Sequence, residues 1–142
     1  MQGDPLSSVL FKLFLSDFDK EMKKISTPKI SLYNTKLEIA YLQFVDDIAL
    51  LADNHLYLQK LINITQEYFI SNRLKINENK TKTVIFRKGG IPKKHDVYYL
   101  NNQKLEIVQA YKYLGVNFQS TGKFHVTAKE VVNKSKQKIN AI

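Results

Sequence analysis

The first 25 residues carry apolar side chains at a helical spacing. Apolar residues recur every three or four positions between Pro5 and Ile25, and polar residues such as Lys12 fall between them. This spacing predicts one amphipathic helix over 5–25. Asp4 would be its N-cap, and Pro5 would take the first helical position, where a missing N–H costs nothing.

Short apolar runs replace the helical spacing after residue 28. Apolar residues alternate over 37–41, and a continuous apolar run extends from Ile48 to Ala52. Both patterns are typical of strands, and Asp tolerates the conformations of a tight turn. The pattern therefore predicts a hairpin with its tip at Asp46-Asp47.

The remainder of the chain alternates between helical and extended patterns. An apolar stripe predicts a helix over 54–72, and a basic helix is predicted over 124–141. Strands are predicted at 83–86, 97–100, 104–108 and 111–118, with Asn101-Asn102 as the turn between the second and third. This order of elements indicates an α+β layer domain.

Composition restricts the class of protein. The chain has 142 residues, which suits one domain, and it has 0 Cys, which excludes a disulfide framework and a thiolate metal site. Its apolar runs are shorter than the ~18 residues needed to span a bilayer. The residues after Met1 form no cationic, apolar leader, so neither membrane association nor export is expected.

Charge is divided unevenly along the chain, whose net charge is +9. Residues 1–70 contain 7 basic and 9 acidic residues, whereas residues 71–142 contain 15 basic and 4 acidic residues. An acidic first half followed by a basic second half suggests a metal or catalytic region joined to a region that binds a polyanion. A basic surface that only maintains solubility is the alternative.

Asp46-Asp47 is the most unusual feature of the sequence, because two carboxylates occupy the tip of an otherwise apolar hairpin. Adjacent carboxylates raise each other's proton affinity, and a hard divalent cation such as Mg²⁺ relieves their repulsion. An isolated Asp-Asp pair is more often a solvated turn, so the assignment depends on the surrounding sequence.

Four segments, one of which contains Asp46-Asp47, follow one another along the chain. They are QGDPLS at 2–7, FVDD at 44–47, LKIN with NKTK over 74–82, and YKYLGV at 111–116. In this order they resemble the motifs of the reverse transcriptase domain of non-LTR, LINE-type retrotransposon polyproteins. The chain departs from that family at Val45, where a small residue is usual, and at Ser8, where Pro is frequent.

The resemblance implies a role for several residues. Asp46 would be a catalytic residue that ligates metal directly, with Asp47 as the supporting catalytic carboxylate. The other residues assigned by the resemblance are Gln2, Gly3, Pro5 and Phe44 at the nucleotide and template, Lys80 and Lys82 at the leaving pyrophosphate, and Tyr113, Leu114 and Gly115 in a primer grip. Structural alternatives stay open. Gln2 and Gly3 could form only a helix-entry turn, Lys80 and Lys82 a basic strand edge, and residues 113–116 a buried strand with a glycine bulge.

The function implied is that of an RNA-directed DNA polymerase. It would transfer nucleotides to a primer 3′-hydroxyl by a two-metal reaction with Mg²⁺, or Mn²⁺ as a substitute. The partners implied are an RNA template, a DNA primer and deoxynucleoside triphosphates, and the family makes a nuclear location plausible. Residues 1–118 would form a partial polymerase palm, an antiparallel sheet with helices on one face, and residues 119–142 the start of a helical thumb.

The resemblance also implies a further metal-binding Asp strand, expected upstream in a longer polyprotein. The chain is therefore expected to be inactive alone, as a truncated piece. Two alternatives remain open from the sequence: a non-enzymatic basic domain that binds nucleic acid, and a decayed remnant of an element.

Overall fold

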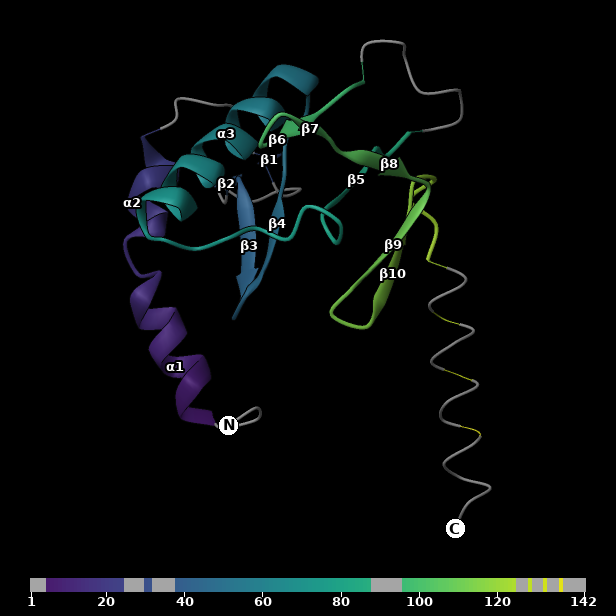
Figure 1. Ribbon diagram of the computed structural model, residues 1–142. Coiled ribbons are helices and arrows are strands. Elements are labelled where there is room, and N and C mark those ends of the chain that lie inside the picture. Colours follow the sequence, from purple (N-terminus) through teal and green to yellow (C-terminus); the bar gives the residue numbers. More distant parts are fainter. Residues whose placement is uncertain are drawn as a thin grey trace. The chain divides into compact units, whose positions relative to one another are not determined.

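The computed structural model describes residues 5–24, 30–31, 38–87 and 96–124, together with 128, 132 and 136 (Figure 1). The elements in chain order are α1 (Pro5–Phe14), α2 (Phe18–Lys23), β1 (Ile30–Ser31), β2 (Glu38–Ile39), β3 (Tyr41–Phe44), β4 (Asp47–Leu50), α3 (His55–Ser71), β5 (Lys82–Val84), β6 (Tyr99–Leu100), β7 (Gln103–Lys104), β8 (Glu106–Val108), β9 (Ala110–Tyr113) and β10 (Val116–Gln119). The predicted α+β class is confirmed.

The chain forms two compact units. Unit 1 contains Met1–Ile76 and Tyr98–Gln103, and unit 2 contains Asn77–Val97 and Lys104–Ile142. This division differs from the predicted boundary at residue 118, which stays a prediction.

The strands that the structure describes pair two by two. The pairs β1–β2, β3–β4 and β9–β10 are antiparallel, whereas β5 and β8 are parallel. The prediction of one antiparallel sheet is therefore wrong in this respect. A parallel pair needs a long connection, which the alternation of apolar residues does not reveal.

The predicted helix over 5–25 is two helices, because the chain turns at residues 15–17 between α1 and α2. Ser16 N–H donates a hydrogen bond to the Leu13 carbonyl at 3.1 Å, and Phe18 N–H donates one to the Leu15 carbonyl at 3.1 Å. Both bonds connect residue i to residue i−3, as in a 3₁₀ turn, instead of to residue i−4 as in an α-helix. The turn aims the side chains of Leu15 and Phe18 into the core.

The core of unit 1 surrounds Phe18, which is fully buried. Its ring lies 5.1 Å from that of Tyr41 and 5.0 Å from that of Tyr68, measured between centroids. The other buried members are Leu15, Met22 and Leu61. This cluster joins α2, α3 and the β3–β4 hairpin.

Helix α1 leaves most of its apolar side chains outside that core. The residues with about half or more of their surface exposed are Leu6, Val9, Leu10, Leu13 and Phe14. Phe11 of α1 packs against the core cluster.

Helix α3 confirms the helix predicted over 54–72. Its N-cap is Asn54, whose side chain accepts a hydrogen bond from Tyr57 N–H at 3.0 Å. The buried positions Leu61, Ile62, Thr65 and Tyr68 recur at helical spacing and form its core face.

The structure divides two of the strands predicted after residue 103. The strand predicted at 104–108 is interrupted at Leu105, so that β8 pairs with β5 while β7 pairs with β6. The strand predicted at 111–118 is the hairpin β9–β10, in which Tyr113 pairs with Val116 across the turn.

The basic helix predicted over 124–141 lies largely outside the described residues. The described positions Ala128, Val132 and Lys136 are helical, and Ala128 N–H donates to the Phe124 carbonyl at 2.9 Å. Among the described helices, none has both the length and the apolar character needed to cross a membrane.

Candidate active site

The acidic pair lies at the tip of the β3–β4 hairpin, as predicted. Phe44 pairs with Asp47 and Tyr41 with Leu50, which leaves Val45 and Asp46 as the two turn residues. The base of the hairpin continues through a 2.8 Å hydrogen bond from Leu51 N–H to the Ala40 carbonyl.

The turn has an unusual backbone at Val45, whose φ is +54°. A positive φ is rare for a β-branched residue and costs on the order of 1–3 kcal/mol when the fold imposes it. Asp46 is not among the described residues with positive φ, so the signs follow the type II′ pattern, which normally has glycine at its first position.

The two faces of the hairpin differ. Tyr41, Ile48 and Leu50 pack against the core of unit 1. On the opposite face Phe44 is 59% exposed, and its cross-strand partner Asp47 is also exposed. Asp46 is exposed at the turn. Both carboxylates are therefore accessible at the end of a hairpin that is fixed at its base.

Two tyrosine–aspartate contacts hold the start of α2, one from this hairpin and one from α3. Tyr41 Oη donates a hydrogen bond to Asp19 Oδ1 at 3.1 Å, and Tyr68 Oη donates to Asp17. Burial, followed by the charge of Asp19 and the hydrogen bond to it, raises the pKa of Tyr41 to about 12. Burial and the bond to Asp17 also raise the pKa of Tyr68. Both tyrosines therefore remain neutral donors at ordinary pH.

The donor set at the tip suits part of a magnesium coordination sphere. Carboxylate oxygens are the ligands that Mg²⁺ prefers, and protein Mg²⁺ sites commonly use one or two carboxylates with water and substrate phosphates. Within the described part of the chain, no group of three or more His, Asp or Glu residues could hold a metal ion. Asp46 and Asp47 fit Mg²⁺ as a partial site that needs other ligands.

Lys80 and Lys82 lie in unit 2, whereas the acidic pair lies in unit 1. Lys82 Nζ forms an ion pair with Glu106 Oε2 at 2.7 Å, across the parallel pair β5–β8. Lys80 is exposed, and its carbonyl accepts a 3.2 Å hydrogen bond from Tyr111 Oη. The assignment of these lysines to pyrophosphate stays a prediction.

The predicted primer-grip residues form the tip of the β9–β10 hairpin. Tyr113 ends β9, and Leu114 and Gly115 are the turn residues with φ of +48° and +84°. Two positive φ values are the type I′ pattern. The Leu114 side chain is 48% exposed, so the tip presents an apolar group to solvent.

The remaining predicted residues are Gln2, Gly3, Pro5 and Phe44. Gln2 and Gly3 lie outside the described residues. Pro5 begins α1, as the sequence predicted. The roles of these residues and of Phe44 at the nucleotide stay predictions.

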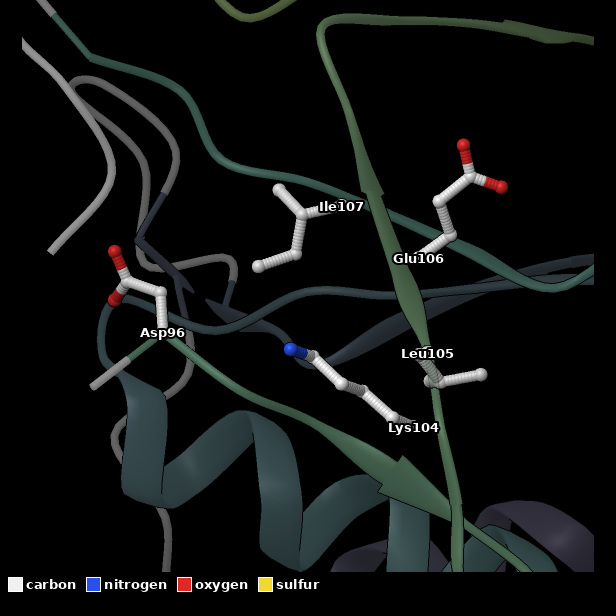
Figure 2. Close-up of a pocket in the computed structure, with 5 residues that line it drawn as sticks. All are labelled: Asp96, Lys104, Leu105, Glu106 and Ile107. Atoms are coloured by element: carbon white, nitrogen blue, oxygen red, sulfur yellow. The ribbon is translucent and has the colours of Figure 1, made fainter. Parts of the chain in front are cut away.

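A pocket of about 320 Å³ in unit 2 was not predicted. Asp96, Lys104, Leu105, Glu106 and Ile107 line it. Figure 2 shows the Lys104 side chain extending toward Asp96, with Ile107 beside it, while Glu106 points away. Asp96 pairs with Arg87. No spacing in the sequence indicated this cluster, because Asp96 is separated from residues 104–107 by a segment that belongs to unit 1.

The comparison with protein families defines the class of this protein. Residues 1–118 match the family model described as reverse transcriptase (RNA-dependent DNA polymerase). The chain belongs to this family, so the predicted resemblance is confirmed.

The chain is also similar to the Pol polyproteins of two retrotransposable elements. It is 28% identical over 147 residues to the retrovirus-related Pol polyprotein from type-2 retrotransposable element R2DM of Drosophila melanogaster, with 97% of this chain covered. It is 28% identical over 127 residues to the Pol polyprotein from type-1 retrotransposable element R2 of Popillia japonica, with 85% covered. The chain spans 13% and 21% of these relatives, and no solved structure matches it significantly.

Proposed function

We propose that this chain forms part of the palm and the start of the thumb of an RNA-directed DNA polymerase of a non-LTR retrotransposon. The observation that carries the proposal is the β3–β4 hairpin, which exposes Asp46 and Asp47 at a tip anchored to the core of unit 1. Residues 1–118 would be the palm with its primer-grip hairpin, and 119–142 the start of the thumb.

In this proposal Asp46 and Asp47 hold Mg²⁺ together with ligands from water and the nucleotide phosphates. The bound metal supplies activation of the primer 3′-hydroxyl and charge stabilisation on the pyrophosphate. The chain itself supplies the anchored hairpin, which keeps the carboxylates in place without rearrangement. Asp46 is the better ligand candidate, as the family resemblance implies, and it is exposed at the turn.

Lys82 would change partners during the reaction. Its ion pair with Glu106 is exposed on the Glu106 side, where 64% of the side chain is accessible. Exposed ion pairs contribute only about 0–1 kcal/mol, so a pyrophosphate could displace Glu106 at little cost. In this role Lys82 stabilises the negative charge of the leaving group.

Unit 2 would bind the template and primer through their phosphates. Its segments 77–97 and 104–142 contain 13 basic and 4 acidic residues, and Lys112 and Lys123 are exposed on and after the β9–β10 hairpin. This charge also supports a second candidate function, a domain that binds nucleic acid without catalysis. The two candidate functions differ in one requirement: catalysis needs the Asp46 carboxylate, whereas binding of nucleic acid does not.

The metal site is tested by titrating the 142-residue protein with Mn²⁺ and following amide line broadening by NMR. We expect weak binding with broadening centred on residues 44–49, and its loss in Asp46→Asn. Asp53→Asn is the matched control, because Asp53 is exposed in the same unit but lies beyond the hairpin. Equal broadening in the Asp46→Asn protein would contradict the assignment.

The reaction is tested in a chimera in which residues 1–118 replace the matching segment of the Drosophila R2 polyprotein. Nucleotide incorporation on a primed RNA template with Mg²⁺ is the measurement. We expect Asp46→Asn to abolish incorporation and Asp53→Asn to preserve it. If both variants incorporate equally while binding hybrid normally, the second candidate function is favoured.

A further inference from the structure

The hairpin at residues 98–103 is held on α3 by two glutamine side chains. Gln59 Nε2 donates to the Tyr99 carbonyl at 2.8 Å, and Tyr99 N–H donates back to Gln59 Oε1 at 2.9 Å. Gln66 Oε1 accepts a 2.7 Å hydrogen bond from Asn101 N–H. Gln59 thus satisfies both backbone polar groups of one strand residue, as a neighbouring strand would.

The two glutamines lie on one side of α3, since seven residues are close to two helical turns. The second amide proton of Gln59 is also engaged, because Nε2 donates to Asn63 Oδ1 at 2.7 Å. Both glutamines are partly buried, whereas their hydrogen bonds to the hairpin lie at the exposed surface. The side chain of Gln59 is therefore held by contacts to α3 and to the hairpin together.

The hairpin matters because of the path of the chain. The chain leaves unit 1 after Ile76, returns at Tyr98 and leaves again after Gln103. If the hairpin left α3, the peptide after Ile76 would be the one remaining junction of unit 1 with the rest. With the hairpin on α3, the chain joins the two units at three points.

We propose that Gln59 and Gln66 form a clasp, which holds the hairpin on α3 and thereby restricts the motion of unit 2 relative to unit 1. The strands of the hairpin have two residues each, and such a short hairpin is marginally stable alone. Burial of Tyr98 and Leu100 assists the docking, but apolar contacts do not provide partners for the backbone of Tyr99 and Asn101. The clasp does not depend on polymerase activity.

Hydrogen exchange of the 142-residue protein tests the clasp. We expect Gln59→Ala to accelerate exchange of the Tyr99 amide about tenfold, and Gln66→Ala to do the same at Asn101. Gln66→Glu should preserve protection, because a carboxylate also accepts the Asn101 hydrogen bond. Glu67→Ala, an exposed position on the same helix, is the control.

The tethering is tested by ¹⁵N relaxation in the Gln59→Ala/Gln66→Ala protein. We expect the difference between the rotational correlation times of the two units to increase relative to the wild type and Glu67→Ala. Retained protection of Tyr99 and Asn101 in the alanine variants would overturn the clasp. Lost protection with unchanged tumbling would overturn its role as a tether.

Discussion

Individual turn residues show how far the sequence predicts the backbone. Asn101 and Asn102 have φ of +50° and +62°, and Asn tolerates this region, so their turn could be predicted. Val45 and Leu114 also have positive φ, although neither type favours it. The pairing of the flanking strands imposes these conformations, and single-residue preferences give no sign of them.

The conformation of Val45 leads to a prediction about stability. We expect Val45→Gly to raise the free energy of unfolding by about 1 kcal/mol, because relief of a strain of about 1–3 kcal/mol exceeds the entropic cost of glycine, about 0.5–1 kcal/mol. Urea unfolding followed by circular dichroism measures the change. Ala49→Gly, in β4 of the same hairpin, lacks a positive φ and should instead be destabilising. Loss of stability in Val45→Gly would show that the turn is not strained.

At the scale of elements, the sequence located α3 within one residue at each end but missed the break between α1 and α2. The helix α3 has a capping residue and a long periodic stripe, which are local signals. The break at residues 15–17 has no glycine or proline. It arises from tertiary contacts, in which Tyr68 and Tyr41 bind Asp17 and Asp19 on either side of the start of α2.

The raised pKa values of Tyr41 and Tyr68 predict how the free energy of unfolding changes at high pH. Folding raises the pKa of Tyr41 from 10.0 to about 12, and that of Tyr68 also increases. The stabilisation that the neutral tyrosine hydroxyl groups provide is therefore complete below pH 10, and it is lost as the pH rises from 10 to about 12. We expect the free energy of unfolding to fall over this range, measured by urea titration at each pH.

The control for this profile is Tyr41→Phe/Tyr68→Phe. Removing both hydroxyls should lower stability at pH 8 but flatten the decline between pH 10 and 12 relative to the wild type. Tyr57→Phe, on the first turn of α3, should leave the slope unchanged. An equally steep decline in the double variant would mean that other groups cause it.

The β9–β10 hairpin gives a second prediction at this scale. A Cβ at Gly115 would meet nothing within 4 Å, so the cost of Gly115→Ala is conformational alone. We expect a loss of about 1 kcal/mol in the free energy of unfolding, because alanine disfavours a φ of +84°. Leu114→Asn should be stabilising, because Asn suits the first position of a type I′ turn. Thermal unfolding measures both variants, and an unaffected Gly115→Ala protein would contradict the turn assignment.

At the scale of the whole molecule, the sequence predicted the α+β class and the family motifs but not the interleaving of the two units. Residues 98–103 belong to unit 1 although both flanking segments belong to unit 2. Likewise, Lys82 pairs with Glu106 in a parallel arrangement that alternation cannot distinguish from an antiparallel one. Long-range pairing of this kind is decided by packing of the complete chain.

The charge distribution predicts how the molecule binds nucleic acid. We expect affinity for an RNA–DNA hybrid to fall steeply with salt, because bound cationic side chains release counterions from the phosphates. Lys112→Ala and Lys123→Ala should each lower the slope of log affinity against log salt by about 1. Fluorescence anisotropy at a series of salt concentrations measures the slope.

The matched control for that measurement is Lys60→Ala. Lys60 is exposed on α3 in unit 1, outside the basic half of the chain. Its removal should leave the slope nearly unchanged. An equal decrease on removing Lys60 would contradict a nucleic-acid surface confined to unit 2.

The exposed apolar side of α1 affects the colloidal behaviour of the protein. At low ionic strength the net charge of +9 keeps molecules apart, whereas salt shortens the range of that repulsion to about 10 Å at 0.1 M. Apolar attraction between α1 stripes then has less to oppose it. Light scattering should therefore show a second virial coefficient that decreases with added salt, and Leu10→Glu should move it toward positive values. The same salt that weakens binding to nucleic acid thus makes the free protein less soluble.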